Sequence, residues 1–178
     1  MNLEPITQKC LFGLDNQFNE LTNLYKKNKL PTKILLSGPK GSGKCTLAYH
    51  LINFILSKDE ELYYDLKNKV INENNISFRL INNKVHPNFY LLDTNPERKN
   101  IEINQIRELI KNLNKSSFNS KPRIILIDNI EFLNVNSINA LLKILEEPNF
   151  NIFFILINNN KKILSTLKSR CLNFRVSL

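Results

Sequence analysis

The sequence predicts an α/β fold in which a five-stranded parallel sheet is flanked by helices. Four short apolar runs are nearly continuous, at 33–37, 88–93, 123–128 and 151–157. Continuous rather than alternating apolar runs are typical of strands buried on both faces. Helix-like segments separate these runs, and such alternation implies right-handed crossovers and a parallel sheet. A fifth, short strand is expected at "LNFRV", residues 172–176.

Apolar residues at helical spacing mark the segments between the strands. They predict helices over 43–57, 103–113, 136–147 and 162–169. The segment 58–86 has the weakest pattern: the spacing of its apolar residues predicts a helix followed by an irregular insertion, and the residues concerned are Leu62, Leu66 and Val70. We find no internal repeat and no linker, so residues 1–178 are expected to form one domain.

The composition is that of a globular protein with a substantial core, since 42% of the 178 residues are hydrophobic and 23% are charged. We see no signal pattern and no apolar run of membrane-spanning length, which predicts a cytoplasmic protein without a membrane partner. The three cysteines, Cys10, Cys45 and Cys171, lie far apart. Their number excludes a disulfide framework and a zinc site made of four cysteines. We expect Cys10 and Cys171 to be buried as small hydrophobic residues.

The chain is strongly basic, with 25 Lys and Arg against 16 Asp and Glu and a net charge of +9. This balance favours polyanionic partners such as nucleic acid. It is equally compatible with a lysine-rich solvated surface, because no stretch interleaves aromatic and basic residues as a base-stacking groove would. Charge alone therefore leaves a plain nucleic-acid-binding module as one open interpretation.

A glycine-rich segment, "SGPKGSGKCT" at 37–46, follows the first predicted strand and opens a helix, as a phosphate-binding loop must. Its glycines allow backbone N–H groups to turn toward phosphate oxygens at the positive end of the helix. Lys44 would reach the β- and γ-phosphates. The alternative is a glycine-rich turn that binds nothing. The predicted nucleotide-binding residues are Gly38, Pro39, Lys40, Gly41, Ser42, Gly43, Lys44, Cys45 and Thr46.

Two departures from the usual pattern predict a pocket that is not an efficient ATPase and that binds ATP or ADP weakly or not at all. Cys45 occupies the Ser/Thr position, and a thiol is a poor ligand for Mg²⁺; Thr46, one step round the helix, cannot simply replace it. Asp128 ends a strand and could give a weak magnesium contact, only with nucleotide bound. The following residue is Asn129, where a hydrolysing enzyme commonly has a glutamate, and an amide cannot accept the proton of water. Glu131 is expected to point elsewhere.

Two further polar residues precede predicted strands. Arg170, in "SRC", lies between a short helix and the last strand, at the rim of the domain. It could pair with a phosphate held by another molecule, as an arginine finger does, or form a surface salt bridge. His86 is a lone histidine, which is more often a hydrogen-bonded structural residue than a ligand.

The motifs "GPKGSGK", "RIILIDNIEFL", "NALLKILEEP" and "LKSRC", in this order, resemble the nucleotide-binding module of AAA+ clamp-loader subunits. "HPNFYLLD" and "IEINQIRELI" resemble the second strand and the following helix of that family. The resemblance covers about residues 8–176. It implies a P-loop AAA+ fold for the chain.

Among these subunits the pattern is most similar to delta-prime of bacterial DNA polymerase III, whose own ATP site is degenerate. The resemblance implies a rigid stator that helps to load the sliding clamp on primed DNA, with motor (gamma/tau) and delta subunits as partners. It also implies that Arg170 acts as a finger in trans and that Asn158 is the sensor at the end of the fourth strand. The family continues into a lid and a collar, which this sequence lacks, so the chain by itself is expected to be monomeric.

Three alternatives to the stator stay open. The first is an active ATPase motor of the gamma/tau type that tolerates Cys45. The second is a small nucleotide kinase, in which "SRC" and "ALLKILEEP" have no reason to occur. The third is the nucleic-acid-binding module suggested by the charge. No zinc is expected, because 58–86, where motor subunits carry a cysteine-ligated insertion, contains no cysteine.

Overall fold

A computed structural model describes residues 4–94, 100–115, 119–147 and 151–177. It contains one sheet of five parallel strands in the order β2-β3-β4-β1-β5. The predicted α/β fold is therefore confirmed. The strands, each within two residues of its predicted bounds, are β1 (Lys33–Ser37), β2 (Phe89–Leu92), β3 (Arg123–Ile127), β4 (Ile152–Asn158) and β5 (Leu172–Arg175).

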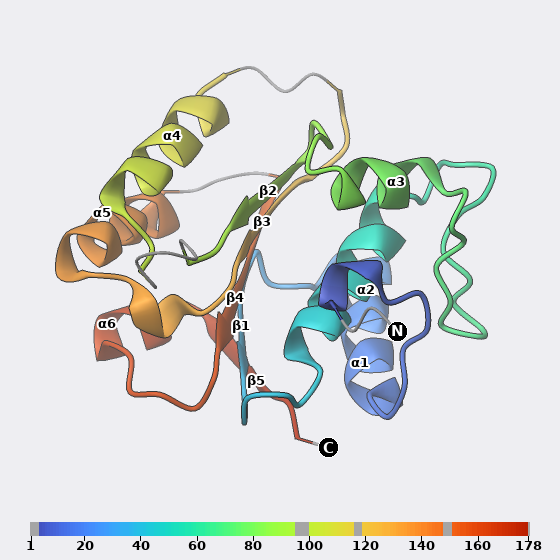
Figure 1. The fold of residues 1–178 in the computed structure, drawn as a ribbon, viewed down its shortest axis with the longest axis horizontal. Helices are drawn as coiled ribbons and strands as arrows, with labels where there is room; N and C mark the ends of the chain where they lie inside the picture. Colours follow the sequence, from blue (N-terminus) through green and yellow to red (C-terminus); the bar gives the residue numbers. More distant parts are fainter. Residues whose placement is uncertain (1–3, 95–99, 116–118, 148–150, 178) are drawn as a thin grey trace.

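Helices cover both faces of this sheet (Figure 1). On one face lie α1 (Asp15–Lys26), α2 (Lys44–Leu56) and α3 (Ile76–Asn82), and on the other lie α4 (Ile103–Leu113), α5 (Val135–Glu146) and α6 (Ser165–Lys168). The short 3₁₀ helices are η1 (Pro5–Thr7) and η2 (Ile130–Phe132). The helix predicted over 103–113 has those bounds, whereas α6 is shorter than predicted. Pro148, which follows "ALLKILEE", lies outside the described residues.

Alternate residues of the central strands pack into two separate hydrophobic cores, one on each face of the sheet. In β3, Ile124 and Leu126 pack with α1 and α2, whereas Ile125 and Ile127 pack with α4 and α5; all four are 0% exposed. Successive side chains of a strand point to opposite faces, so a strand covered on both faces must be apolar at every position. This explains why the apolar runs are continuous in the sequence.

The segment 58–86 does not form the predicted first helix. Asp65 and Val70 exchange backbone hydrogen bonds of 3.0 and 3.1 Å across a turn, and Leu11 and Ile71 donate to the carbonyls of Lys69 and Lys9. This segment therefore pairs with the N-terminal segment, a long-range contact that local spacing cannot reveal. The helix of this region, α3, begins later, where the Asn75 side chain accepts from the backbone N–H of Phe78.

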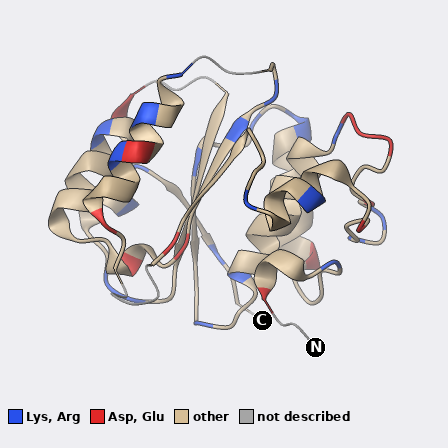
Figure 2. Cartoon of the chain, turned by 45° about the horizontal axis from the view of Figure 1, so that its top comes forward, with Lys and Arg blue, Asp and Glu red and all other residues tan. Residues whose placement is uncertain are grey.

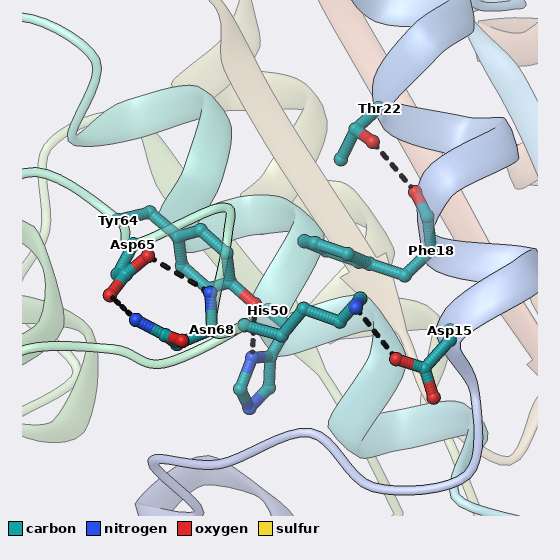
Figure 3. Close-up of polar contacts among 8 residues, drawn as sticks. Asp15, Phe18, Thr22, His50, Tyr64, Asp65 and Asn68 are labelled. Atoms are coloured by element: carbon teal, nitrogen blue, oxygen red, sulfur yellow. Dashed lines mark hydrogen bonds and ion pairs between the residues drawn. The ribbon is translucent and has the colours of Figure 1, made fainter.

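Buried polar contacts attach the same segment to the helices. The hydroxyl of Tyr64 hydrogen-bonds Nδ1 of His50 in α2 at 2.8 Å, and its ring packs against Phe18 of α1 (Figure 3). Asn68 donates to the Asp65 carboxylate in the turn. Tyr64 is 2% exposed, so it anchors the segment after α2 in the core.

Three smaller expectations have mixed outcomes. His86 is buried and hydrogen-bonds Ser77 Oγ at 3.3 Å through Nε2 and accepts from Asn88 N at 3.1 Å through Nδ1, so its structural role is confirmed. Cys171 is half-buried against the core, but Cys10 is exposed, so its predicted burial was wrong. The backbone of Cys10 pairs with Val70 in an edge bridge, which leaves its side chain outside.

Basic side chains are spread over helices on both faces of the sheet rather than gathered on one wall (Figure 2). Within the described residues, no helix is long and apolar enough to cross a membrane. The global charge therefore does not by itself locate a partner.

The two buried histidines should make stability depend on pH. Burial lowers the pKa of His50 and of His86 to about 4, against about 6.5 in an unfolded chain. Below pH 6.5 the unfolded chain binds protons that the folded chain does not, so the free energy of unfolding falls as the pH drops toward 4. We expect a loss of about 1.4 kcal/mol per histidine per pH unit in this window, measured by urea unfolding.

His50→Gln and His86→Gln should each remove about half of that pH dependence. A slope that both single variants leave unchanged would contradict the assignment.

Candidate nucleotide site

The glycine-rich loop connects β1 to α2 at the carboxyl edge of the sheet. Adding a Cβ to Gly38 would place it 2.0 Å from the carbonyl oxygen of Val176, just after β5. Gly41 has a left-handed φ of 84° and open space around it. The first glycine is therefore required for packing against the chain's own backbone, and the second for the turn itself.

Lys44, the first residue of α2, is folded back onto the loop. Its Nζ donates to the carbonyl oxygens of Gly38 and Pro39 at 3.0 and 2.5 Å and lies 3.3 Å from Ser42 Oγ. It is 3% exposed, and burial lowers its pKa. Among the residues that the structure describes, no side chain caps α2, so the N–H groups of its first turn are available to an anion.

A cavity of about 350 Å³ adjoins this loop. Its wall brings together most of the predicted nucleotide-binding residues with Asp128; the lining residues are Pro5, Lys40, Gly41, Gly43, Lys44, Cys45, Thr46, Asp128, Asn129, Ile157 and Asn159. The other predicted residues, Gly38, Pro39 and Ser42, belong to the same loop but do not line the cavity. The residues fit a bound phosphate, because a loop lysine and an uncapped helix end face one cavity.

The residues that would have to bind Mg²⁺, Cys45 and Asp128, suit the ion less well than the loop suits a phosphate. The Cys45 thiol faces the Asp128 carboxylate; burial and that carboxylate raise the thiol's pKa far above its usual range, so it stays protonated. Burial and the nearby Asp93 also raise the pKa of Asp128. Among the described residues, no group of three or more His, Cys, Asp or Glu side chains could hold a metal ion. A protonated thiol beside a single carboxylate whose pKa is raised is a poor donor set for Mg²⁺.

The side-chain amide of Asn129 is hydrogen-bonded through both its nitrogen and its oxygen. Its Nδ2 donates to Asp93 Oδ1 at 2.9 Å, and its Oδ1 accepts from Asn159 Nδ2 at 2.9 Å. Asn159 also donates to Glu131, through its side chain at 3.1 Å and its backbone N–H at 3.4 Å. Glu131 is thus held by Asn159, and the position after Asp128 offers no base for water.

Asn159, rather than Asn158, lines the nucleotide cavity. Asn158 ends β4 with its Nδ2 donating to the Lys161 carbonyl at 3.0 Å. The sequence did not separate these neighbours, because three consecutive asparagines carry no pattern. It also missed Asp93. The available signal was position, since Asp93, Asp128 and Asn159 each directly follow a parallel strand and such strand ends meet at one edge.

Arg170 lies apart from this cavity. It follows α6, on the sheet face opposite α2 (Figure 1). Its guanidinium forms an ion pair with Glu146 of α5, donates to the Thr166 carbonyl at 2.8 Å, and its side chain remains 33% exposed. The surface salt bridge, one of the two alternatives for this residue, is therefore present, and the arginine finger stays a prediction.

A family model described as "DNA polymerase III, delta subunit" matches residues 13–177. The chain belongs to this family of AAA+ clamp-loader subunits. Several relatives of this chain are delta-prime subunits of DNA polymerase III, and among clamp-loader subunits the chain is most like that type. The protein of Buchnera aphidicola from Baizongia pistaciae is 32% identical over 97% of this chain and 49% of its own length. That of Pseudomonas aeruginosa is 31% identical over 77% of this chain and 40% of its own length.

Gamma and gamma/tau subunits also match this chain. The gamma/tau subunit of Mycoplasma genitalium is 30% identical over 96% of this chain and 27% of its own length. A solved gamma subunit-related protein of Thermotoga maritima superposes with a TM-score of 0.59, 20% identity, and coverage of 92% of this chain and 46% of its own. That likeness shows the fold alone. The chain spans about half the length of the delta-prime relatives named above.

The two glycines should respond differently to the same substitution. Gly38→Ala must displace backbone, so we expect it to lower the free energy of unfolding by about 3 kcal/mol, the upper end of the usual cost of overpacking. Gly41→Ala meets no atom and has only the left-handed strain, about 1–2 kcal/mol. Urea unfolding without nucleotide measures both. Equal losses would show that Gly38 has no special packing role.

Restoring a hydroxyl should restore magnesium-dependent nucleotide binding. We expect Cys45→Thr to tighten binding of a fluorescent ATP analogue roughly tenfold in the presence of Mg²⁺, with no gain when the metal is chelated. Cys171→Thr, on another half-buried cysteine, is the matched control. An equal gain without Mg²⁺ would refute the role assigned to position 45.

Proposed function

We propose that this chain is the nucleotide-binding module of a delta-prime-type stator, which donates Arg170 to an ATP site on a neighbouring motor subunit. The observation that carries the proposal is that Arg170 pairs with Glu146 of α5, a helix on the sheet face opposite α2 (Figure 1), and does not line the chain's own nucleotide cavity. From there it cannot serve its own cavity. It is nevertheless partly exposed, so a neighbouring subunit can reach it.

The environment of Arg170 suits such a role. Glu146 and the Thr166 carbonyl each engage one terminal nitrogen, which fixes the direction of the guanidinium. A guanidinium has five N–H donors, so N–H groups remain for a phosphate oxygen. A finger held in place before assembly loses little side-chain entropy when it meets the phosphate.

The residues of the chain's own nucleotide cavity give a second argument for the same proposal. The Mg²⁺ hydroxyl is replaced by Cys45, and the general base is replaced by an amide that is already hydrogen-bonded at both ends. Weak ATP or ADP binding through Lys44 without turnover is the expected behaviour. The partners would be gamma/tau and delta subunits, with the sliding clamp and primed DNA reached through the complex in the cytoplasm.

An active motor is the second candidate. It is favoured by the gamma/tau relatives and by the complete glycine pattern with Lys44. Magnesium-dependent ATP hydrolysis by the isolated chain, abolished by Lys44→Ala, would select it over the stator.

The test of the stator uses the full-length protein, reconstituted with gamma/tau and delta subunits on primed DNA and sliding clamp. An arginine finger contributes on the order of 10³-fold or more at a single site, so Arg170→Ala should lower ATP turnover clearly while assembly is retained. Arg170→Lys should not restore it, because an ammonium cannot reproduce the planar fork.

Lys168→Ala, an exposed cation on α6, is the matched control and should leave turnover unchanged. If Arg170→Ala leaves turnover unchanged, Arg170 has only a structural role in its ion pair with Glu146, and the arginine-finger proposal is refuted.

A further inference from the structure

A second and larger cleft, of about 730 Å³, opens where β1 and β4 begin, at the amino edge of the sheet. It lies between the ends of α1 and α2 and the segment that follows α2. The nucleotide cavity is at the carboxyl edge, so the two are separated by the length of the strands. None of the chemistry assigned above uses this cleft.

Aromatic rings form much of its wall. Tyr25 packs edge-on against Phe54 and against Phe153, with ring centroids 6.0 Å apart in both pairs. Tyr63 also lines the cleft and is 63% exposed. Its neighbour Tyr64 is fixed in the core by His50 and Phe18 (Figure 3). The exposed ring is therefore displayed on an anchored backbone rather than on a free loop.

Lysines accompany these rings. Lys26 and Lys58 line the cleft, Lys27 and Lys29 lie next to it in sequence, and all four are exposed. Within the described parts of the chain, none of the four forms an ion pair. The carboxylate of Asp59 acts on Tyr25, where it adds to the effect of burial in raising the pKa of that phenol. Further carboxylates, Glu60, Glu61 and Asp65, also lie next to the cleft in sequence. The lining itself contains two lysines and, among the described residues, no Asp or Glu.

We propose that this cleft binds single-stranded nucleic acid. A base stacks on the exposed face of Tyr63 against the aromatic wall, and the flanking phosphates pair with Lys26 and Lys58. Every base has a π-face, so exposed aromatic rings combined with cations bind single strands without reading sequence. An acidic peptide would use the lysines but gains less from several rings in one cleft.

The combination is created by folding. Tyr25 and Lys26 come from the end of α1, Lys58 and Tyr63 from the segment after α2, and Phe153 from β4. No single stretch of sequence interleaves aromatic and basic residues, so a stacking groove could not be predicted from the sequence.

The experiment measures fluorescence anisotropy of a labelled oligothymidylate of about ten nucleotides with the 178-residue chain. Tyr63→Ala should weaken binding about 5- to 150-fold, the range found when one stacking ring is removed, and Tyr63→Phe should retain it. The double variant Lys26→Ala/Lys58→Ala should reduce the salt slope of log K by about 1.4, the value for two phosphates of a single strand.

Matched controls are Phe12→Ala, an aromatic residue that is 81% exposed outside the cleft, and Lys162→Ala, an exposed cation outside it. Both should bind like the unaltered chain. Equal losses in the controls, or no loss with Tyr63→Ala, would overturn the proposal. Binding of an acidic, phenylalanine-containing peptide that depends on Tyr63, with no binding of the oligonucleotide, would assign the cleft to a protein partner instead. The assay contains neither ATP nor other subunits, so its failure leaves the role of Arg170 untouched.

Discussion

The structure depends on one constraint: the central strands β1, β3 and β4 are covered on both faces, so nearly every residue of these strands must be apolar. Ile124 to Ile127 illustrate this, since all are fully buried and consecutive side chains enter different cores. Polar groups cannot occupy such strands without partners. Polar chemistry is therefore displaced to the strand ends, where the backbone leaves the sheet.

This displacement produces the candidate sites. At the carboxyl edge, the residues that follow β2, β3 and β4 form one hydrogen-bonded group through Asp93, Asn129 and Asn159. At the amino edge, residues near the starts of β1 and β4 meet the ends of α1 and α2 around a cleft with a different character, aromatic and basic. The same sheet thus separates the candidate nucleotide cavity from the cleft proposed to bind single strands. Arg170 occupies a third position, on the face away from α2.

Much of this arrangement could be predicted from the sequence, because it depends on local patterns. Continuous apolar runs gave the strands, and the spacing from Ile103 to Leu113 gave α4 with its observed bounds. Prediction failed where long-range contacts decide. Val70 has the spacing of a helical residue but pairs with the backbone of Cys10 and of Asp65. The helix α1 was not predicted at all, because only a narrow stripe around Phe18 and Leu21 is buried. Likewise, only the fold distinguishes Asn158 from Asn159.

The contact between Gly38 and Val176 has a wider consequence. The first glycine of the phosphate loop is confined by the chain's own backbone just after β5, and no nucleotide takes part in that contact. Selection for a folded domain would then be enough to preserve this glycine whether or not the chain hydrolyses ATP. A glycine-rich signature in such a chain is evidence of architecture, and the neighbouring positions 45 and 129 are better indicators of turnover.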